Sequence, residues 1–170
     1  MANSGTARNH ECQRAEELGL DGIDLRILSE LQKNGRIANN ELSDRVGISP
    51  PPCLRRVRAL HARGFIKTIR AILDEKLLGY EIVSFVTVAL EGHAEPGLIE
   101  FEATIQNLPP VQECWLVSGE MDYLLKCVTP SITEMQALIG QLASMPNVRN
   151  VKSFLTLRGT KDAPLPLPTM

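Results

Sequence analysis

Residues 39–60 read NNELSDRVGISPPPCLRRVRAL, and the pattern within them indicates how the first half of the chain folds. Leu42 and Val46 lie four residues apart, so they share one face of a helix. Gly47 follows the last apolar residue, where glycine favours the left-handed conformation that ends a helix. The pair Ser49–Pro50 predicts a second helix, because serine caps free N–H groups and proline suits the first helical position. The stretch therefore predicts two short helices joined by a tight turn.

The second of these helices predicts a surface for duplex DNA. Its inner side is an apolar stripe, whereas Arg55 and Arg58 fall away from the stripe and Arg56 lies on its flank. Arginines on a helix that enters the major groove reach guanine edges or phosphates. An arginine-rich face can also be a solvated surface, and two helices joined by a turn can be a packing unit without DNA. The stripe consists of Cys53, Leu54, Val57, Leu60 and His61, and the residues predicted to contact DNA are Ser49, Pro51, Arg55, Arg56 and Arg58.

The distribution of charge favours DNA binding. Residues 21–80 hold 11 Lys and Arg against 7 Asp and Glu, whereas residues 81–170 hold 5 against 10. The chain is close to neutral only because a basic half and an acidic half cancel. Such asymmetry is typical of a nucleic-acid-binding module joined to a domain with another purpose.

Flanking residues complete a three-helix unit with a wing. Asp21 is the predicted N-cap of an earlier helix, and Asn34–Gly35 ends that helix. Gly64 ends the arginine-bearing helix, and Phe65–Leu73 is predicted to form two short strands, a small wing. The core face of the earlier helix consists of Ile23, Ile27, Leu28 and Leu31.

From Glu81 onward the pattern alternates between strands and helices. The strand Ile82–Leu90 is apolar on both faces, which predicts that both are covered. A helical stripe over Leu98–Leu108 follows, and Ser131–Glu134 is a capping box that opens another helix. The resulting order, β-α-β-β-α-β, is the ferredoxin-like plan, with two helices on one face of a four-stranded sheet. The remaining predicted strands are Val111–Ser118, Asp122–Thr129 and Val148–Leu157.

The second face of this sheet still needs burial. The economical solution is a second copy of the chain, packed sheet on sheet in a two-fold dimer. A dimer also presents two DNA-reading helices to two half-sites. The sequence therefore predicts a homodimer.

One polar cluster interrupts the apolar hairpin, at Gly119 and Asp122–Tyr123. These residue types can simply form the turn, because glycine adopts positive φ and aspartate makes local hydrogen bonds. They can also form a binding site, in which free N–H groups near Gly119 and the Asp122 carboxylate hold the charged ends of a small amino acid. The residues alone leave both interpretations open.

No catalytic residue, metal site or cofactor is predicted. The three histidines, His10, His61 and His93, have no recognisable catalytic spacing. No apolar run approaches the roughly 20 residues of a membrane span, and the N-terminus lacks the apolar core of a signal peptide. We therefore expect a cytoplasmic protein. Buried free thiols are expected at the four cysteines, which lack C-x-x-C spacing: Cys12, Cys53, Cys114 and Cys127.

Motifs in both halves, taken in order, closely resemble the Lrp/AsnC family of transcription regulators, and its leucine-responsive branch most of all. The resemblance covers about residues 20–167. In the first half it is carried by LDGID at 20–24, ILSELQ at 27–32, VGISP at 46–50, PCL at 52–54 and GFI at 64–66. In the second half it is carried by QEC at 112–114, LVSG at 116–119 and DYLLK at 122–126.

The resemblance implies an α+β fold, with an N-terminal winged helix-turn-helix and a C-terminal βαββαβ ferredoxin-like effector domain. It implies a sequence-specific DNA-binding regulator, associated with the nucleoid, whose assembly from dimers to octamers responds to a small amino acid. Carried over by position, the effector-binding residues are Ser118, Gly119, Met121, Asp122, Tyr123 and Thr156. The expected organisation is a flexible tail at 1–19, the winged helix-turn-helix at 20–66, a linker strand at 67–80, the effector domain at 81–158 and a tail at 159–170.

Two departures from the family pattern bear on DNA recognition. Pro51 stands where the family commonly has threonine, and Arg55 stands where the leucine-responsive proteins usually have glutamate. We expect a different operator preference from these changes. Two alternatives remain: a tetrapyrrole-pathway decarboxylase of the same architecture, or an architectural protein that binds DNA with low specificity.

Overall fold

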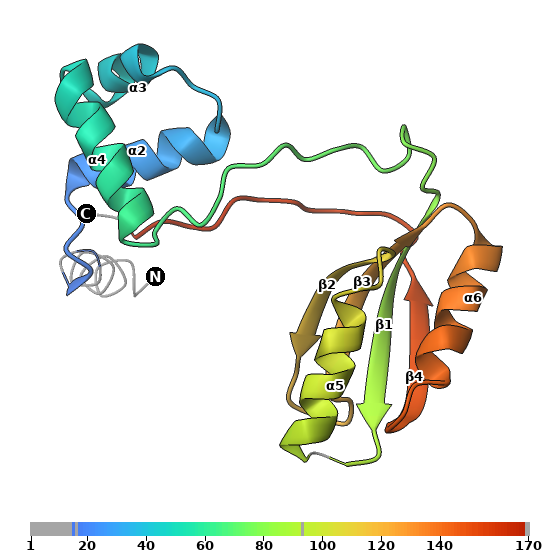
Figure 1. Ribbon diagram of the computed structural model, residues 1–170. Coiled ribbons are helices and arrows are strands. Elements are labelled where there is room, and N and C mark those ends of the chain that lie inside the picture. Colours follow the sequence, from blue (N-terminus) through green and yellow to red (C-terminus); the bar gives the residue numbers. More distant parts are fainter. Residues whose placement is uncertain (1–14, 16, 93, 169–170) are drawn as a thin grey trace, which may run out of the picture. The chain divides into compact units, whose positions relative to one another are not determined.

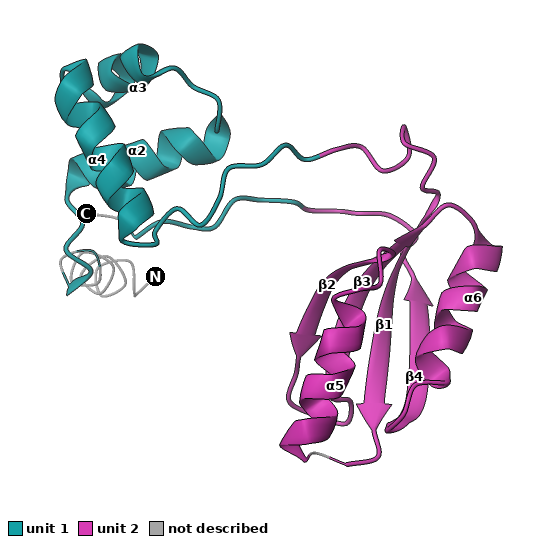
Figure 2. Cartoon of the chain, viewed as in Figure 1, with its two compact units in different colours: residues 1–72, 162–170 teal, residues 73–161 magenta. Residues whose placement is uncertain are grey.

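The chain forms two compact units. The computed structural model describes residues 15, 17–92 and 94–168 (Figure 1). Unit 1 comprises residues 1–72 and 162–170, and unit 2 comprises residues 73–161 (Figure 2). The predicted N-terminal tail and His93 fall largely or wholly outside the described residues. The end of the chain, expected to be a separate tail, is part of unit 1 from residue 162 onward.

Unit 1 contains the three predicted helices, α2 (Gly22–Lys33), α3 (Asn39–Val46) and α4 (Pro50–Ala62). Asp21 caps α2 as predicted, since its side chain accepts hydrogen bonds from the N–H groups of Ile23 and Asp24, each at 2.9 Å. The turn between α3 and α4 is also as predicted. Gly47 there has a φ of 74°, and Pro50 occupies the first turn of α4.

The core of unit 1 lies where the three helices meet. Asn39 reinforces this arrangement, because its Nδ2 donates to the carbonyl of Pro50 over 2.9 Å and so joins the start of α3 to the start of α4. Buried apolar side chains come from every helix: Leu25, Ile27, Leu28, Leu42, Val46, Cys53 and Leu60.

The predicted wing strands are not formed. Phe65–Leu73 leaves α4 as an extended segment without strand pairing. A two-strand wing needs a tight turn, and no residue between Phe65 and Leu73 is a glycine, asparagine or proline that would supply one. The segment instead crosses the end of α2 at Gly35, where an added Cβ would lie 2.9 Å from Cγ2 of Ile69.

Unit 2 has the predicted β-α-β-β-α-β order. Its elements are β1 (Ile82–Leu90), α5 (Glu95–Ile105), β2 (Val111–Leu116), β3 (Tyr123–Thr129), α6 (Ile132–Ala143) and β4 (Val148–Leu155). The four strands form one antiparallel sheet in the order β2-β3-β1-β4. The bounds differ from the predicted ones by a few residues at the strand ends.

Both helices of unit 2 pack on one face of the sheet (Figure 1). The core joins Phe101 of α5 and Leu142 of α6 to alternate strand residues such as Val86, Val88 and Leu125. The register places the neighbouring residues on the opposite face, which the helices leave open.

The open face of the sheet is apolar and aromatic. Phe85 of β1 lies opposite Phe154 of β4, and Leu124 of β3 lies opposite Trp115 of β2. Phe154 is 55% exposed and Trp115 is 41% exposed. Both faces of β1 were expected to be covered, but within one chain only the face under α5 and α6 is covered.

Within the described part of the chain, no helix combines the length and apolar character required to cross a bilayer.

Candidate nucleic-acid interface and effector site

The outer side of α4 bears two exposed arginines that make no ion pair with another described residue. Arg55 and Arg58 lie three residues apart on the exposed side, away from the buried Cys53 and Leu60. No ion pair joins either arginine to another residue that the structure describes. Pro51 is exposed on the same side of the helix. These side chains can reach a duplex laid against α4.

Ser49 occupies the N-cap position of α4, but the predicted capping bond is absent: its side chain accepts no hydrogen bond from the first turn. With Pro50, Pro51 and Pro52 in that turn, three N–H groups that a cap would satisfy do not exist. The exposed Ser49 hydroxyl therefore stays available for a phosphate oxygen.

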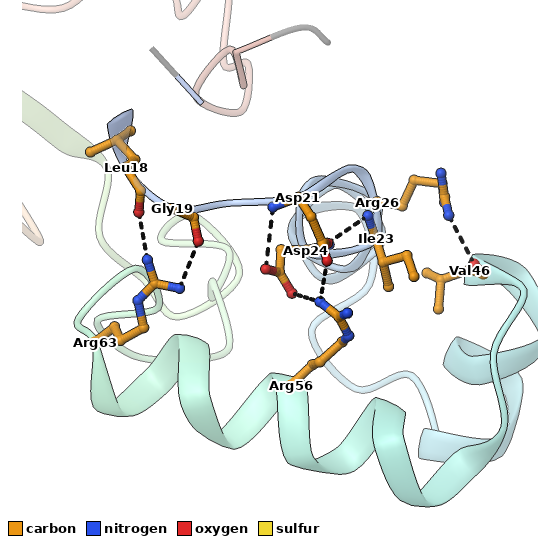
Figure 3. A network of polar contacts seen from close by, with 9 residues as sticks. All are labelled: Leu18, Gly19, Asp21, Ile23, Asp24, Arg26, Val46, Arg56 and Arg63. Atoms are coloured by element: carbon orange, nitrogen blue, oxygen red, sulfur yellow. Dashed lines mark hydrogen bonds and ion pairs between the residues drawn. The ribbon is translucent and has the colours of Figure 1, made fainter. Parts of the chain in front are cut away.

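Arg56 has a different role from its two neighbours (Figure 3). Its Nη1 lies 2.7 Å from Oδ2 of Asp21 and 2.8 Å from Oδ1 of Asp24, and both carboxylates belong to the start of α2. Burial raises the pKa of the Asp21 carboxyl, but hydrogen bonds from the Asp24 N–H and from Arg56 outweigh this and lower it below its ordinary value. Arg56 therefore fixes α4 against α2.

Two further arginines of unit 1 also hold its parts together. Arg63 donates to the carbonyls of Leu18 and Gly19, and its guanidinium lies 4.7 Å from the centre of the Phe65 ring (Figure 3 shows the two hydrogen bonds). Arg26 donates to the carbonyl of Val46, over 3.3 Å. The arginines that hold unit 1 together are thus different residues from Arg55 and Arg58, which make no ion pair with a described residue.

In unit 2 the predicted effector loop closes the hairpin between β2 and β3. Gly119 has a φ of 134°, a conformation that other residues rarely adopt. The Asp122 carboxylate accepts a hydrogen bond of 2.7 Å from the N–H of Leu90, and the Asp122 N–H donates to the carbonyl of Val88 over 3.0 Å. Asp122 thereby ties the loop to the end of β1.

A cavity of about 620 Å³ adjoins this loop. Met121 is the one predicted effector residue among its lining residues; the others were not predicted. Arg149 and Lys152 bring positive charge from β4, and Glu120 brings negative charge from the loop. Ala89 lies opposite Asn150 in the β1–β4 register, and this pairing brings β4 beside the loop. The lining residues are Ala89, Glu120, Met121, Arg149, Asn150 and Lys152.

The side chain of Tyr123 does not face this cavity. It is 1% exposed, and its hydroxyl donates to Oε1 of Glu102 on α5 over 2.9 Å. Its ring lies 4.6 Å from the ring of Phe101. Burial, together with the bond to Glu102, raises the pKa of Tyr123 well above its ordinary value. The tyrosine is a core residue.

Thr156 also lies away from the loop. Its hydroxyl and its N–H both donate to the carbonyl of Val83, over 2.8 Å and 3.0 Å. Val83 stands at the start of β1, whereas Ala89, at the cavity, stands near its end. Six residues of strand separate them, which is roughly 20 Å. Thr156 joins the start of β1 to the end of β4.

The cysteines differ in exposure. Cys53 and Cys127 are buried free thiols, as predicted, but Cys114 is exposed, because it lies on the edge strand β2. Partial burial of its sulfur atom and the nearby charge of Glu102 raise the pKa of Cys114 to about 11, and burial raises the pKa of Cys127 to about 12. Both thiols are therefore protonated at neutral pH. Among the described residues, no group of three or more His, Cys, Asp or Glu side chains could hold a metal ion.

Two family models match the chain. Residues 20–67 match the winged helix-turn-helix DNA-binding model, and residues 83–166 match the Lrp/AsnC ligand binding domain. Together they span both units.

Several known proteins are similar to this chain over most of its length. The chain is 48% identical over 145 residues to the leucine-responsive regulatory protein of Rhizobium meliloti, covering 85% of this chain and 93% of that protein. It is 42% identical to the leucine-responsive regulatory protein of Escherichia coli K12, covering 85% and 88%. A Neisseria meningitidis transcriptional regulator, solved in complex with L-methionine, superposes with a TM-score of 0.82 at 33% identity, covering 86% and 96%. An AsnC family regulator from Agrobacterium tumefaciens gives a TM-score of 0.80 at 30% identity, covering 86% and 97%.

Proposed function

The chain belongs to the Lrp/AsnC family of DNA-binding transcriptional regulators, and from this premise we propose which of its residues read DNA, which hold an effector, and how copies assemble. Arg55 and Arg58 form the reading pair on α4, with Ser49 and Pro51 at the entry of the helix. Arg56 acts indirectly, by holding α4 against α2 through Asp21 and Asp24.

One observation carries the DNA-reading proposal: three arginines stand close together on α4, and two are exposed and free of ion pairs with described residues, whereas the third is paired inside the unit. An exposed guanidinium reaches a guanine edge or a phosphate at little internal cost. Arg55 adds a positive charge where the leucine-responsive proteins usually have a negative one. It therefore shifts operator preference and strengthens contact with phosphate.

Titration of DNA over a salt series tests this proposal. The logarithm of the binding constant should fall linearly with the logarithm of salt concentration. Arg58→Ala should weaken binding and, if Arg58 contacts a phosphate, make the slope shallower by about one unit. Wild-type affinity and slope in the Arg55→Ala, Arg58→Ala double variant would place the reading surface elsewhere. Equal affinity for selected and random duplexes would favour a low-specificity architectural protein.

For unit 2, a small amino acid is the proposed effector, bound at the loop 118–122 and the adjoining cavity. Arg149 and Lys152 suit the carboxylate of such a ligand, Glu120 suits its ammonium group, and Met121 offers an apolar surface to its side chain. The L-methionine complex of the Neisseria regulator and the leucine-responsive relatives support this ligand class. The loop N–H groups beside Gly119 add further donors for the carboxylate.

Assembly is proposed to begin with a two-fold dimer in which the open faces of two sheets pack together. Phe85, Trp115, Leu124 and Phe154 form an aromatic and apolar surface on that face, and helices cover only the other one. Dimers then associate further, with octamers as the proposed end state. The effector acts by binding one assembly state more tightly than another.

We further propose a cytoplasmic, nucleoid-associated protein without enzymatic activity. None of these relatives and solved structures is named as an enzyme, and they give no support to a decarboxylase.

A thermal-shift screen of the twenty amino acids tests the effector class, since a ligand that prefers the folded assembly raises its melting temperature. No shift with any amino acid would remove the effector from the proposal and leave DNA binding untouched.

A further inference from the structure

The segment 162–168 lies on unit 1, although the chain has already passed through the whole of unit 2 (Figure 2). The carbonyl of Leu165 accepts a hydrogen bond of 3.0 Å from Nε2 of Gln32 on α2. The side chain of Leu167 is half-buried and packs against the hydrophobic core of unit 1. Residues more than 130 positions apart in the sequence therefore form one surface.

The segment itself forms one wall of a groove of about 580 Å³ in unit 1, through residues 165–168. The other walls are α2, through Leu28, Leu31 and Gln32, and the segment Phe65–Ile69. Gly35 allows Phe65–Ile69 to approach, because any larger residue there would meet Ile69. These other walls are thus built from elements that the three-helix fold already fixes.

The chemistry of the segment suits such a groove. Prolines at 164, 166 and 168 hold the backbone extended and remove the N–H groups that a β-ladder would need. Little conformational freedom is lost when such a segment docks. The two leucines differ in burial: Leu165 is 74% exposed, whereas Leu167 packs on the core. Leu167 therefore provides the main apolar contact of the segment, and the Leu165 carbonyl provides a hydrogen bond.

We propose that the surface formed by α2 and Phe65–Ile69 is a docking site for the chain's own Leu-Pro-Leu-Pro segment, and that docking gives unit 2 a second, non-covalently anchored connection to the DNA-binding unit. The first connection is the covalent one through residues 67–80. Both connections leave the sheet of unit 2 at one place, since Thr156 at the end of β4 is bonded to Val83 at the start of β1. A displacement of that end of the sheet would therefore move the starting points of both connections.

Tethering makes a weak site sufficient. A short flexible connection gives an effective concentration of the order of millimolar. The segment is docked at least half of the time if its intrinsic Kd is about 1 mM or lower. This sets the affinity that a free peptide must show.

A peptide-binding experiment tests the site without using DNA or any effector, so its outcome is independent of the proposed function. A fluorescein-labelled peptide DAPLPLP, residues 162–168, is titrated with a variant of the chain that ends at Lys161, and anisotropy is recorded. We expect saturable binding with a Kd of about 1 mM or lower. The peptide with Leu167→Ser should lose this binding, whereas the peptide with Leu165→Ser should keep it. Provided that circular dichroism shows the shortened variant to be folded, equal binding of the two altered peptides, or no binding of any peptide, would overturn the proposal.

The full-length chain supplies the second measurement, which also decides the question if the shortened variant does not fold. Leu167→Ser should lower the melting temperature by about 4 °C or more, and it should leave the groove open to the added wild-type peptide. Leu165→Ser is the matched control and should leave the melting temperature and the occupancy of the groove unchanged. Identical melting temperatures for the two variants, with no peptide bound to either, would show that the segment contributes no stability and has no binding site on unit 1.

Discussion

Arg56 on α4 and Asp24 on α2 form an ion pair across the helices of unit 1, with 2.8 Å between Nη1 and Oδ1. Asp24 is a buried carboxylate, and Arg56 supplies the opposite charge beside it. The same guanidinium nitrogen lies 2.7 Å from Oδ2 of Asp21, the N-cap of α2. One side chain thus couples the capping of α2 to the position of the helix that bears Arg55 and Arg58.

This pairing predicts that adjacent arginines of α4 differ in what they stabilise. Arg56→Ala leaves the Asp24 carboxylate buried without its cation, which should cost about 1–3 kcal/mol of unfolding free energy. Arg55→Ala removes an exposed side chain and should leave that free energy unchanged, while it weakens DNA binding. Urea unfolding, followed by circular dichroism, measures the first effect, and a DNA titration measures the second. An unfolding midpoint for Arg56→Ala equal to that of the wild type would show that the ion pair contributes nothing.

The lowered pKa of Asp21 predicts a pH dependence of stability in the acid range. Because the folded pKa lies below the ordinary value of 3.8, the folded state binds fewer protons than the unfolded state between these two values. The stabilising contribution is complete above pH 3.8 and is lost as the pH falls through the folded pKa. Asp21→Asn should remove this part of the pH dependence and yet keep the N-cap, since asparagine caps as well as aspartate does.

Unfolding curves of the wild type and Asp21→Asn between pH 2 and 6 provide the measurement. The two stabilities should differ at pH 6 and converge toward pH 2. Parallel curves over the whole range would mean that neither the Asp24 N–H nor Arg56 lowers the pKa of Asp21 in the folded state.

Sequence patterns predicted the local structure of both units because caps, turns and helix periodicity depend on neighbouring residues. Asp21, Gly47 and Pro50 mark their helix ends by themselves. The family resemblance places Tyr123 in the effector site by position, whereas the structure places its side chain under α5, because the face of the sheet that the helices cover determines which β3 residues are buried. The partner of Arg56 lies 32 residues away. No local signal distinguishes it from the exposed Arg55.

Contacts between distant segments account for the other differences. The cationic side of the cavity comes from β4, which only the β1–β4 register brings beside the loop. The hydrogen bond between Gln32 and the carbonyl of Leu165 joins residues that are 133 positions apart in the sequence. Thr156 was assigned to the effector site by position in the family resemblance, and its bond to Val83 became visible only when the two strands were paired.

The position of the cavity predicts which side chains bind the effector carboxylate. Arg149→Met and Lys152→Met keep the length of the side chain and remove its charge, so each should weaken binding of the amino acid that gives the largest thermal shift by about tenfold or more. Thr156→Val removes one hydroxyl bond at the far end of the sheet and should leave that affinity unchanged. Isothermal titration calorimetry measures all three. A loss of affinity in Thr156→Val that equals the loss in Lys152→Met would move the site to the other end of β4.

The open face of the sheet predicts the effect of charge at Phe154. Phe154→Asp puts a carboxylate opposite Phe85, where a second sheet would have to bury it without a partner, so the dimer should dissociate. Ile99→Asp on α5 is a suitable control, because Ile99 is a similarly exposed apolar residue, at 58%, but belongs to a helix on the covered side. Analytical ultracentrifugation at micromolar concentration should give a monomer for Phe154→Asp and the wild-type mass for Ile99→Asp. The monomer should also bind a two-half-site duplex more weakly than the dimer, since it presents a single α4. A dimer that persists in Phe154→Asp, together with dissociation in Ile99→Asp, would place the primary interface on the helices instead of on the sheet.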